Sequence, residues 1–210
     1  GAVTPFATEI MNATGLAFSM TGDLFVSSRY DGSIYTVDSA GNVQLYLEGM
    51  GIATGIAFDR GSNLYVGDRS GSIFKISPEK EIFVFATLEP SIAAYHLAFG
   101  LDDHLYVTGP TTSSFDSIYR ISPAGQVERF FTGLGRPQGL AVDIEGALYA
   151  VASYRGRRGI LRFKKDSGPE PVVAGINLVG IAFDFDDNLI VAESGSLFSV
   201  PLRITGNPLP

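Results

Sequence analysis

Arginine and tyrosine recur in the polar, glycine-rich segments that separate the short apolar runs of this chain. The arginines concerned are Arg29, Arg69, Arg136, Arg155, Arg157 and Arg158, with Tyr30, Tyr95 and Tyr154 among them. Arginine binds carboxylates and phosphates through two parallel hydrogen bonds, and it also stacks on aromatic rings. The pattern therefore predicts a face that binds a small anionic or sugar-like ligand. The alternative that stays open is a loop face on which these arginines pair with Asp31, Asp68, Asp116 and Glu193.

Candidates for acid–base or nucleophilic chemistry are few. His96 follows Tyr95, and its imidazole could transfer protons near neutral pH; a hydrogen-bonded filler of the interior is the other interpretation. Ser113, Ser114 and Ser117 have no histidine partner nearby in the sequence, and the chain has no cysteine. We therefore assign no catalytic residue. The predicted ligand-binding residues are Arg29, Arg69, Tyr95, His96, Arg136, Gln138, Tyr154 and Arg155.

These residues are positioned by an internal repeat. An apolar triplet recurs in Gly15-Leu16-Ala17-Phe18, Gly55-Ile56-Ala57-Phe58, His96-Leu97-Ala98-Phe99, Gly139-Leu140-Ala141-Val142 and Gly180-Ile181-Ala182-Phe183. A period of about 40 residues is typical of propellers and solenoids. Each copy continues with a polar turn and further short β-branched and aromatic runs, which indicate strands. Four antiparallel strands in each repeat predict the blade of a β-propeller.

The two ends of the chain complement each other in this pattern. Residues 1–14 align without a gap on residues 41–54, which contain a fourth strand, whereas no convincing fourth strand follows Val200. We therefore predict an all-β, single-domain β-propeller over residues 1–210. It has five four-stranded blades that start near residues 15, 55, 96, 139 and 180. In this prediction residues 3–8 complete the last blade and close the ring, which removes two exposed strand edges.

The phrases "GLAF…GDLFV", "GIAF…SNLYV" and "GLAV…GALYA" resemble the NHL-repeat and gluconolactonase-like (SMP-30) β-propellers. The resemblance covers residues 2–202 and implies a metal-dependent lactonase, in which Glu, Asn and Asp side chains just before the first strands bind a divalent cation. The matching residues here are Thr14, Thr54, Tyr95, Gln138 and Val179. None is a carboxylate, although hard cations need several oxygen ligands. We therefore expect no metal ion and no cofactor.

Composition limits the partners. With a net charge of −7, broad binding to nucleic acid or to an anionic membrane surface is not expected. No apolar run approaches the roughly 20 residues that span a bilayer. The start "GAVTPFATEI" shows no signal-peptide pattern. A mature extracytoplasmic protein, a fragment of a longer six-bladed protein and a cytoplasmic protein all fit these features.

The channel face is formed by the loops that precede each first strand and those that join the second strand to the third. We interpret the chain as a non-catalytic binding or scaffold module that recognises a small anionic or sugar-like ligand, or a protein partner, on this face. The alternative is a metal-dependent lactonase or hydrolase of the gluconolactonase type. Among the face loops, residues 108–117 are the longest, and we predict that this loop partly covers the channel mouth.

Overall fold

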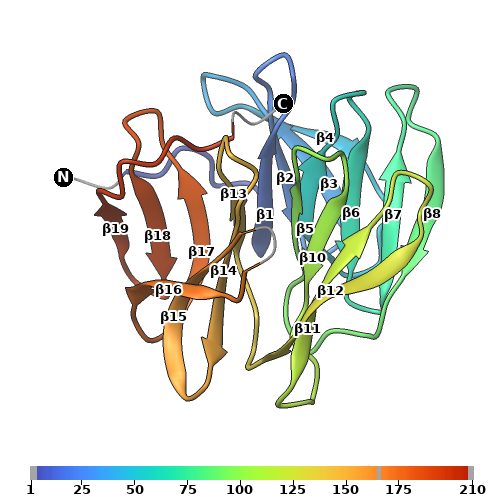
Figure 1. The fold of residues 1–210 in the computed structure, drawn as a ribbon. Helices are drawn as coiled ribbons and strands as arrows, with labels where there is room; N and C mark the ends of the chain where they lie inside the picture. The colour runs from blue at the N-terminus through green and yellow to red at the C-terminus, as the bar shows by residue number, and fades with distance from the viewer. Residues whose placement is uncertain (1–3, 165–166, 208–210) are drawn as a thin grey trace. The chain divides into compact units, whose positions relative to one another are not determined.

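Every regular element of the described chain is a β-strand. The computed structural model describes residues 4–164 and 167–207, and their strands form five antiparallel sheets in chain order (Figure 1). The predicted all-β, five-bladed β-propeller is confirmed. Within these residues no helix is long and apolar enough to cross a membrane.

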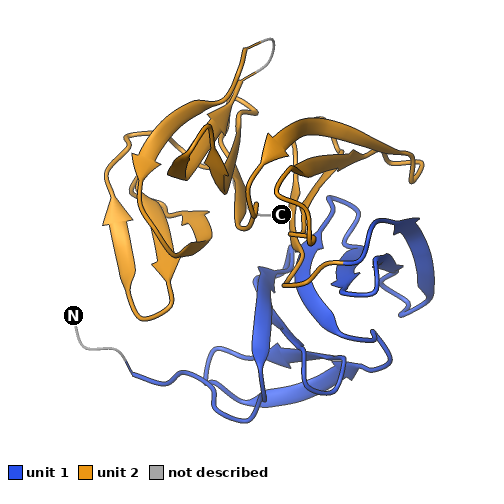
Figure 2. Ribbon diagram, turned by 90° about the horizontal axis from the view of Figure 1, so that it is seen from below, with its two compact units in different colours: residues 1–90, 209–210 blue, residues 91–208 orange. Residues whose placement is uncertain are grey.

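The chain divides into two compact units, residues 4–90 and residues 91–207 (Figure 2). The first unit holds two blades: β1 (Ala13–Phe18), β2 (Leu24–Ser28), β3 (Ser33–Val37) and β4 (Val43–Leu47), then β5 (Ala53–Phe58), β6 (Leu64–Asp68), β7 (Ser72–Ile76) and β8 (Ile82–Thr87). Within each of these blades the strands pair in chain order.

The second unit holds three blades. They are β9 (His96–Phe99), β10 (Leu105–Thr108), β11 (Asp116–Ile121) and β12 (Val127–Leu134); β13 (Leu140–Val142), β14 (Leu148–Tyr154), β15 (Arg157–Phe163) and β16 (Glu170–Ala174); and β17 (Leu178–Phe183), β18 (Leu189–Glu193) and β19 (Leu197–Val200). The last blade thus has three described strands where the others have four.

The predicted fourth strand of that blade is not formed by the described part of residues 3–8; Val3 lies outside the described residues. Residues 4–8 have no strand conformation. In the first unit the Phe6 carbonyl lies against Gly41, so closely that a side chain on Gly41 would overlap it. Residues 5–9 accordingly border the start of β4.

A turn of one design follows the first strand of every blade. The amide of its first residue donates to the carbonyl four residues later, at 2.9–3.1 Å: Ser19 to Asp23, Asp59 to Asn63, Gly100 to His104, Asp143 to Ala147 and Asp184 to Asn188. In three of the turns the first residue is an aspartate whose carboxylate accepts further amides of the same turn. Such side chains mimic backbone groups and fix the turn.

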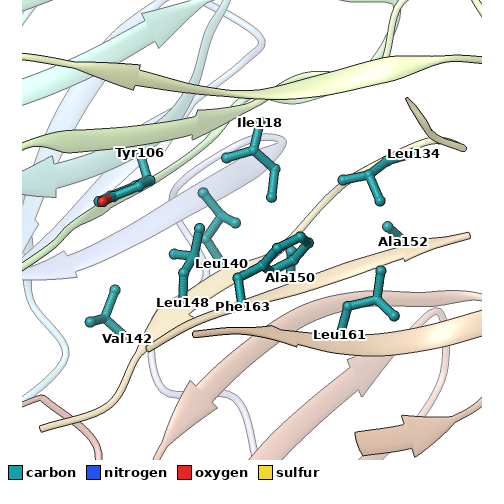
Figure 3. Packing of buried hydrophobic residues seen from close by; sticks show 10 residues of the cluster. All are labelled: Tyr106, Ile118, Leu134, Leu140, Val142, Leu148, Ala150, Ala152, Leu161 and Phe163. Carbon is teal, nitrogen blue, oxygen red and sulfur yellow. The ribbon is translucent and has the colours of Figure 1, made fainter. Parts of the chain in front are cut away.

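The blades of the second unit pack face to face through buried apolar side chains. Figure 3 shows Tyr106, Ile118 and Leu134 of one blade facing residues of the next. Those residues are Leu140, Val142, Leu148, Ala150, Ala152, Leu161 and Phe163. A second cluster joins the middle blade of this unit to the last blade. Tyr149 and Ile160 of the middle blade pack there against Leu189 and Val191 of the last blade. Alternate residues of each strand therefore enter one core or the next.

Glycine at the start of the first strand has a steric reason. A Cβ at Gly139 would lie 2.6 Å from the Val179 carbonyl oxygen and 2.9 Å from the Gly180 Cα, both on the next first strand. A Cβ at Gly180 would meet only the Ala192 Cβ, at 3.5 Å. His96 occupies this slot in its own blade, where the next first strand, β13, begins only at Leu140.

Candidate functional site

Residues of several loops and adjoining strands in the second unit surround a cavity of about 840 Å³. It lies among the loops of all three blades of this unit. The lining residues are Ser113, Ser114, Gly135, Arg136, Gln138, Val151, Ala152, Ser153, Arg158, Gly159, Gly175, Asn177, Leu178, Val179 and Ser194. A volume of this size accommodates a small organic molecule.

One wall is the segment before β13, which carries Arg136 and Gln138. Gly135 and Ser153 exchange backbone hydrogen bonds of 2.8 Å, and the Gln138 amide donates to the Val151 carbonyl, also at 2.8 Å. Between these fixed points Arg136 has a φ of +48°. A residue that precedes proline, as Arg136 precedes Pro137, usually has an extended backbone. Here the hydrogen bonds on both sides hold a sharp left-handed turn instead.

A second wall is the β14–β15 hairpin. Arg158 lies directly opposite Ser153 in the register, so the two side chains share one face of the sheet. The next residue, Gly159, lies against the Val173 carbonyl so closely that any side chain there would overlap it. The Gly175 amide donates to the Arg158 carbonyl at 3.2 Å. The backbone that carries Arg158 is therefore held on both sides.

The long loop between β10 and β11 borders the cavity through Ser113 and Ser114. Its base is fixed by Asp116, which accepts hydrogen bonds from the Thr111 amide at 3.1 Å and the Thr111 hydroxyl at 2.7 Å. Gly109 packs on the Tyr95 ring, where a Cβ would overlap it. The loop thus extends from Tyr95 to the cavity.

Tyr95 and His96 are not among the residues that line this cavity. Tyr95 is fully buried. Although part of His96 is accessible to solvent, burial of its imidazole lowers its pKa to about 4, so the ring is neutral at pH 7. His96 pairs with Thr108 in the β9–β10 register, and the Thr108 hydroxyl donates to the Gln138 carbonyl at 2.6 Å. His96 is therefore connected to the cavity residue Gln138 only through Thr108, its partner on the neighbouring strand.

The other predicted ligand-binding residues lie elsewhere. The Arg155 guanidinium stands 5.1 Å from the centre of the Tyr154 ring, on the exposed turn of the β14–β15 hairpin. Arg29 and Arg69 belong to the first unit and occupy equivalent slots, since their amides donate to the carbonyls of Asn12 and Ile52. Of the eight predicted residues, Arg136 and Gln138 line the cavity.

The five residues that match the metal positions of the resembled family do not fit a hard cation. Thr54 is buried, its hydroxyl donates to the Gly67 carbonyl at 2.7 Å, and its own carbonyl accepts the Ser27 hydroxyl. The Thr14 hydroxyl donates to the Asn12 carbonyl at 2.9 Å. Across residues 4–164 and 167–207 there is no group of three or more His, Cys, Asp or Glu side chains that could hold a metal. These positions supply no charged oxygen ligand.

Several cavity residues were missed as individual candidates, although their loops were identified as part of the channel face. Ser153 and Asn177 are polar residues of ordinary type, and neither stands out by spacing or motif. In the structure Asn177 has a left-handed backbone, with a φ of +59°, which Asn tolerates better than most residues.

No protein-family model matches the sequence, and no curated protein matches it. Solved structures do match. A gluconolactonase from Xanthomonas campestris is 17% identical, with a TM-score of 0.76 over 98% of this chain and 78% of its own. The PQQ-bound aldose sugar dehydrogenase of Streptomyces coelicolor is 20% identical, with a TM-score of 0.76 over 100% and 83%. Regucalcin, a calcium-binding protein from Agrobacterium tumefaciens, is 15% identical, with a TM-score of 0.74 over 95% and 74%.

The structural neighbours are thus gluconolactonase-like and regucalcin-like β-propellers, as the sequence resemblance predicted. They overturn the prediction of a non-catalytic binding module, because a lactonase and a dehydrogenase stand among them. They favour the alternative reading, an enzyme of the gluconolactonase type. At identities of 20% or less, these structures establish the fold of this chain and not its reaction.

Proposed function

We propose that this protein is a hydrolase that opens small sugar-derived lactones in the cavity of its second unit. The observation that carries the proposal is the cavity itself, which combines neutral polar donors with a short apolar surface. Its fold neighbours include a gluconolactonase, which supports this choice of reaction class. The NHL-like repeats support only the scaffold, since their shared residues are strands and turns.

The lining suits a molecule that has hydroxyl groups on its edge and C–H groups on its face. Gln138, Asn177 and Ser153 offer amide and hydroxyl groups to sugar hydroxyls. Val151 and Leu178 offer apolar contact to the ring. A nucleic acid or a membrane surface is no part of the proposal, because the chain carries a net charge of −7.

The proposed reaction is attack of water on the lactone carbonyl. No histidine, aspartate or glutamate among the described residues lines the cavity, so the proposal assigns no side chain as the base, and the hydroxyl and amide groups of the lining orient the water. The side-chain amides of Gln138 and Asn177 would donate to the oxyanion of the tetrahedral intermediate. When the intermediate collapses, the C–O bond of the ring breaks, the ring oxygen takes the proton that the water gives up, and an open hydroxy acid is released.

Hydrolysis of gluconolactone, followed by the base needed to hold the pH constant, tests the proposal. The purified protein should exceed the spontaneous rate, and Gln138→Ala should lower kcat by about a hundredfold, as expected for loss of a donor to the oxyanion. Gln126→Ala is the matched control, since this exposed glutamine lies in the β11–β12 turn, outside the cavity lining, and should leave kcat unchanged. A wild-type rate equal to the spontaneous rate would show the proposal to be wrong.

The same assay addresses the metal. Because the matching positions carry no carboxylate and Thr54 is committed to other bonds, activity should persist after chelation with EDTA and should not rise on addition of calcium. Loss of activity with EDTA, restored by a stoichiometric divalent cation, would contradict this part of the proposal.

A further inference from the structure

We propose that the substrate of this cavity carries a carboxylate, recognised by Arg136 and Arg158, so that the preferred lactones are those of acidic sugars. This inference rests on the proposed function of the same cavity and specifies its substrate class. It assigns a specificity role to two side chains that come from separate segments of one blade.

The first argument is the charge balance of the lining. Two arginines line the cavity, and none of its other lining residues is an aspartate or glutamate. Among the described residues neither Arg136 nor Arg158 forms an ion pair. The chain as a whole is acidic, with 22 Asp and Glu against 15 Lys and Arg. An uncompensated positive cavity in an acidic protein favours an anionic occupant.

The second argument is the fixed position of Arg136. Its φ of +48° is uncommon for a residue with a side chain, and the flanking bonds of Gly135 and Gln138 hold it there. Glycine would adopt this conformation without strain. A strained residue kept in place by its surroundings is found at binding sites more often than elsewhere. The guanidinium is therefore presented from a backbone that does not need to rearrange when a ligand binds.

The third argument is the position of Arg158 in the hairpin. Its backbone is tied to Gly175 by a hydrogen bond and is followed by Gly159, which fits only without a side chain. Its partner across the strand pair, Ser153, adds a hydroxyl on the same face. Two guanidinium groups with neutral donors beside them match one carboxylate and the hydroxyl groups next to it.

Two lactones that differ in one group test the inference. Gluconolactone is neutral, whereas glucarolactone carries a carboxylate at the opposite end of the same sugar skeleton. The wild type should show a kcat/KM at least about tenfold higher for glucarolactone, as expected for charge-assisted hydrogen bonds. In the Arg136→Ala/Arg158→Ala double variant the ratio of the two kcat/KM values should fall to about one. Arg129→Ala, which removes an exposed arginine outside the cavity lining, should keep the ratio.

Binding of glucarate, the open product, measured by calorimetry separates this inference from the proposed function. Wild type and Arg129→Ala should bind glucarate, and the double variant should bind it at least about tenfold more weakly. Equal hydrolysis of both lactones without glucarate binding would overturn the inference and leave the hydrolase intact. Arginine-dependent glucarate binding without hydrolysis of either lactone would overturn the hydrolase and leave carboxylate recognition standing. Equal binding of inorganic phosphate and glucarate, in wild type and double variant alike, would also overturn the inference.

Discussion

The two ends of the strands differ in how far their side chains repeat. At one end, the turn after each first strand has the same backbone hydrogen bond in all five blades, and aspartates reinforce three of these turns. At the other end, the slot before the first strand holds Thr54 in one blade and Gln138 in another, with different surroundings. The difference suits a repeating end that stabilises the fold and a variable end that carries the proposed site.

The strongest case at the repeating end is Asp143, and its loss should be the largest effect. This carboxylate is fully buried and accepts hydrogen bonds from the Ala147 amide at 2.8 Å, the Tyr149 hydroxyl at 3.1 Å and the Arg162 guanidinium at 2.6 Å. Asp143→Ala leaves these donors without their acceptor. We expect a loss of about 3–5 kcal/mol in the free energy of unfolding, measured by denaturant titration.

Asp184 is the matched control, because it occupies the same slot in the last blade. It accepts the amides of Asp186 and Asn188 at 2.9 Å but has no arginine or tyrosine partner among the described residues. Asp184→Ala should therefore cost clearly less than Asp143→Ala. Equal losses in the two variants would mean that the turn alone, and not the buried ion pair, supplies the stability.

The free energy of unfolding should fall at low pH because of the buried His96. Burial lowers its pKa from 6.5 to about 4, so between these values the unfolded state binds a proton that the folded state does not. The contribution of the neutral ring to the free energy of unfolding is therefore fully present above pH 6.5. It is lost as the pH drops toward 4, by about 3 kcal/mol in total. Thermal melts of wild type and His96→Gln across this range check the prediction. An unchanged pH dependence in the variant would remove His96 as its source.

The glycine slot gives a smaller, steric test. Gly139→Ala would press a methyl group against the Val179 carbonyl and the Gly180 Cα, whereas Gly180→Ala would meet only ordinary contact with Ala192. We expect Gly139→Ala to cost about 2 kcal/mol and Gly180→Ala less than about 0.5 kcal/mol. Similar melting temperatures for the two variants would show that the first strands can separate easily at this point.

The repeating end is also the part that the sequence revealed best. The triplets and turns recur because each blade must present the same apolar faces and the same turn, and such requirements leave a period in the sequence. The described strands of the last blade depart from this repeat, because residues 4–8 have no strand conformation. Residues 1–14 resemble a fourth strand, but the contact of Phe6 with Gly41 depends on packing that no residue pattern encodes.

The cavity could be located by loop but not by residue. The sequence identified the loops that contain Arg136, Arg158 and Asn177 as one face, and these residues do line one cavity. It could not distinguish Arg158, which lies opposite Ser153 and lines the cavity, from Arg155, which lies on the exposed turn over Tyr154. The register of the β14–β15 hairpin decides this, and a shift of one residue would exchange the faces.

The smallest effect on stability should come from the side chains with the largest role in the proposed site. Arg158 is exposed and forms no ion pair with any other described residue, so Arg158→Ala removes few contacts. We expect the free energy of unfolding to change by less than about 0.5 kcal/mol. Two like charges in one cavity also repel, so removing one can offset the lost contacts of its alkyl chain. Denaturant titration of Arg158→Ala and Arg129→Ala should therefore give nearly the same result. A loss of more than about 2 kcal/mol in Arg158→Ala alone would place this arginine with Asp143 among the residues that stabilise the fold, and the division between the two ends of the strands would not hold.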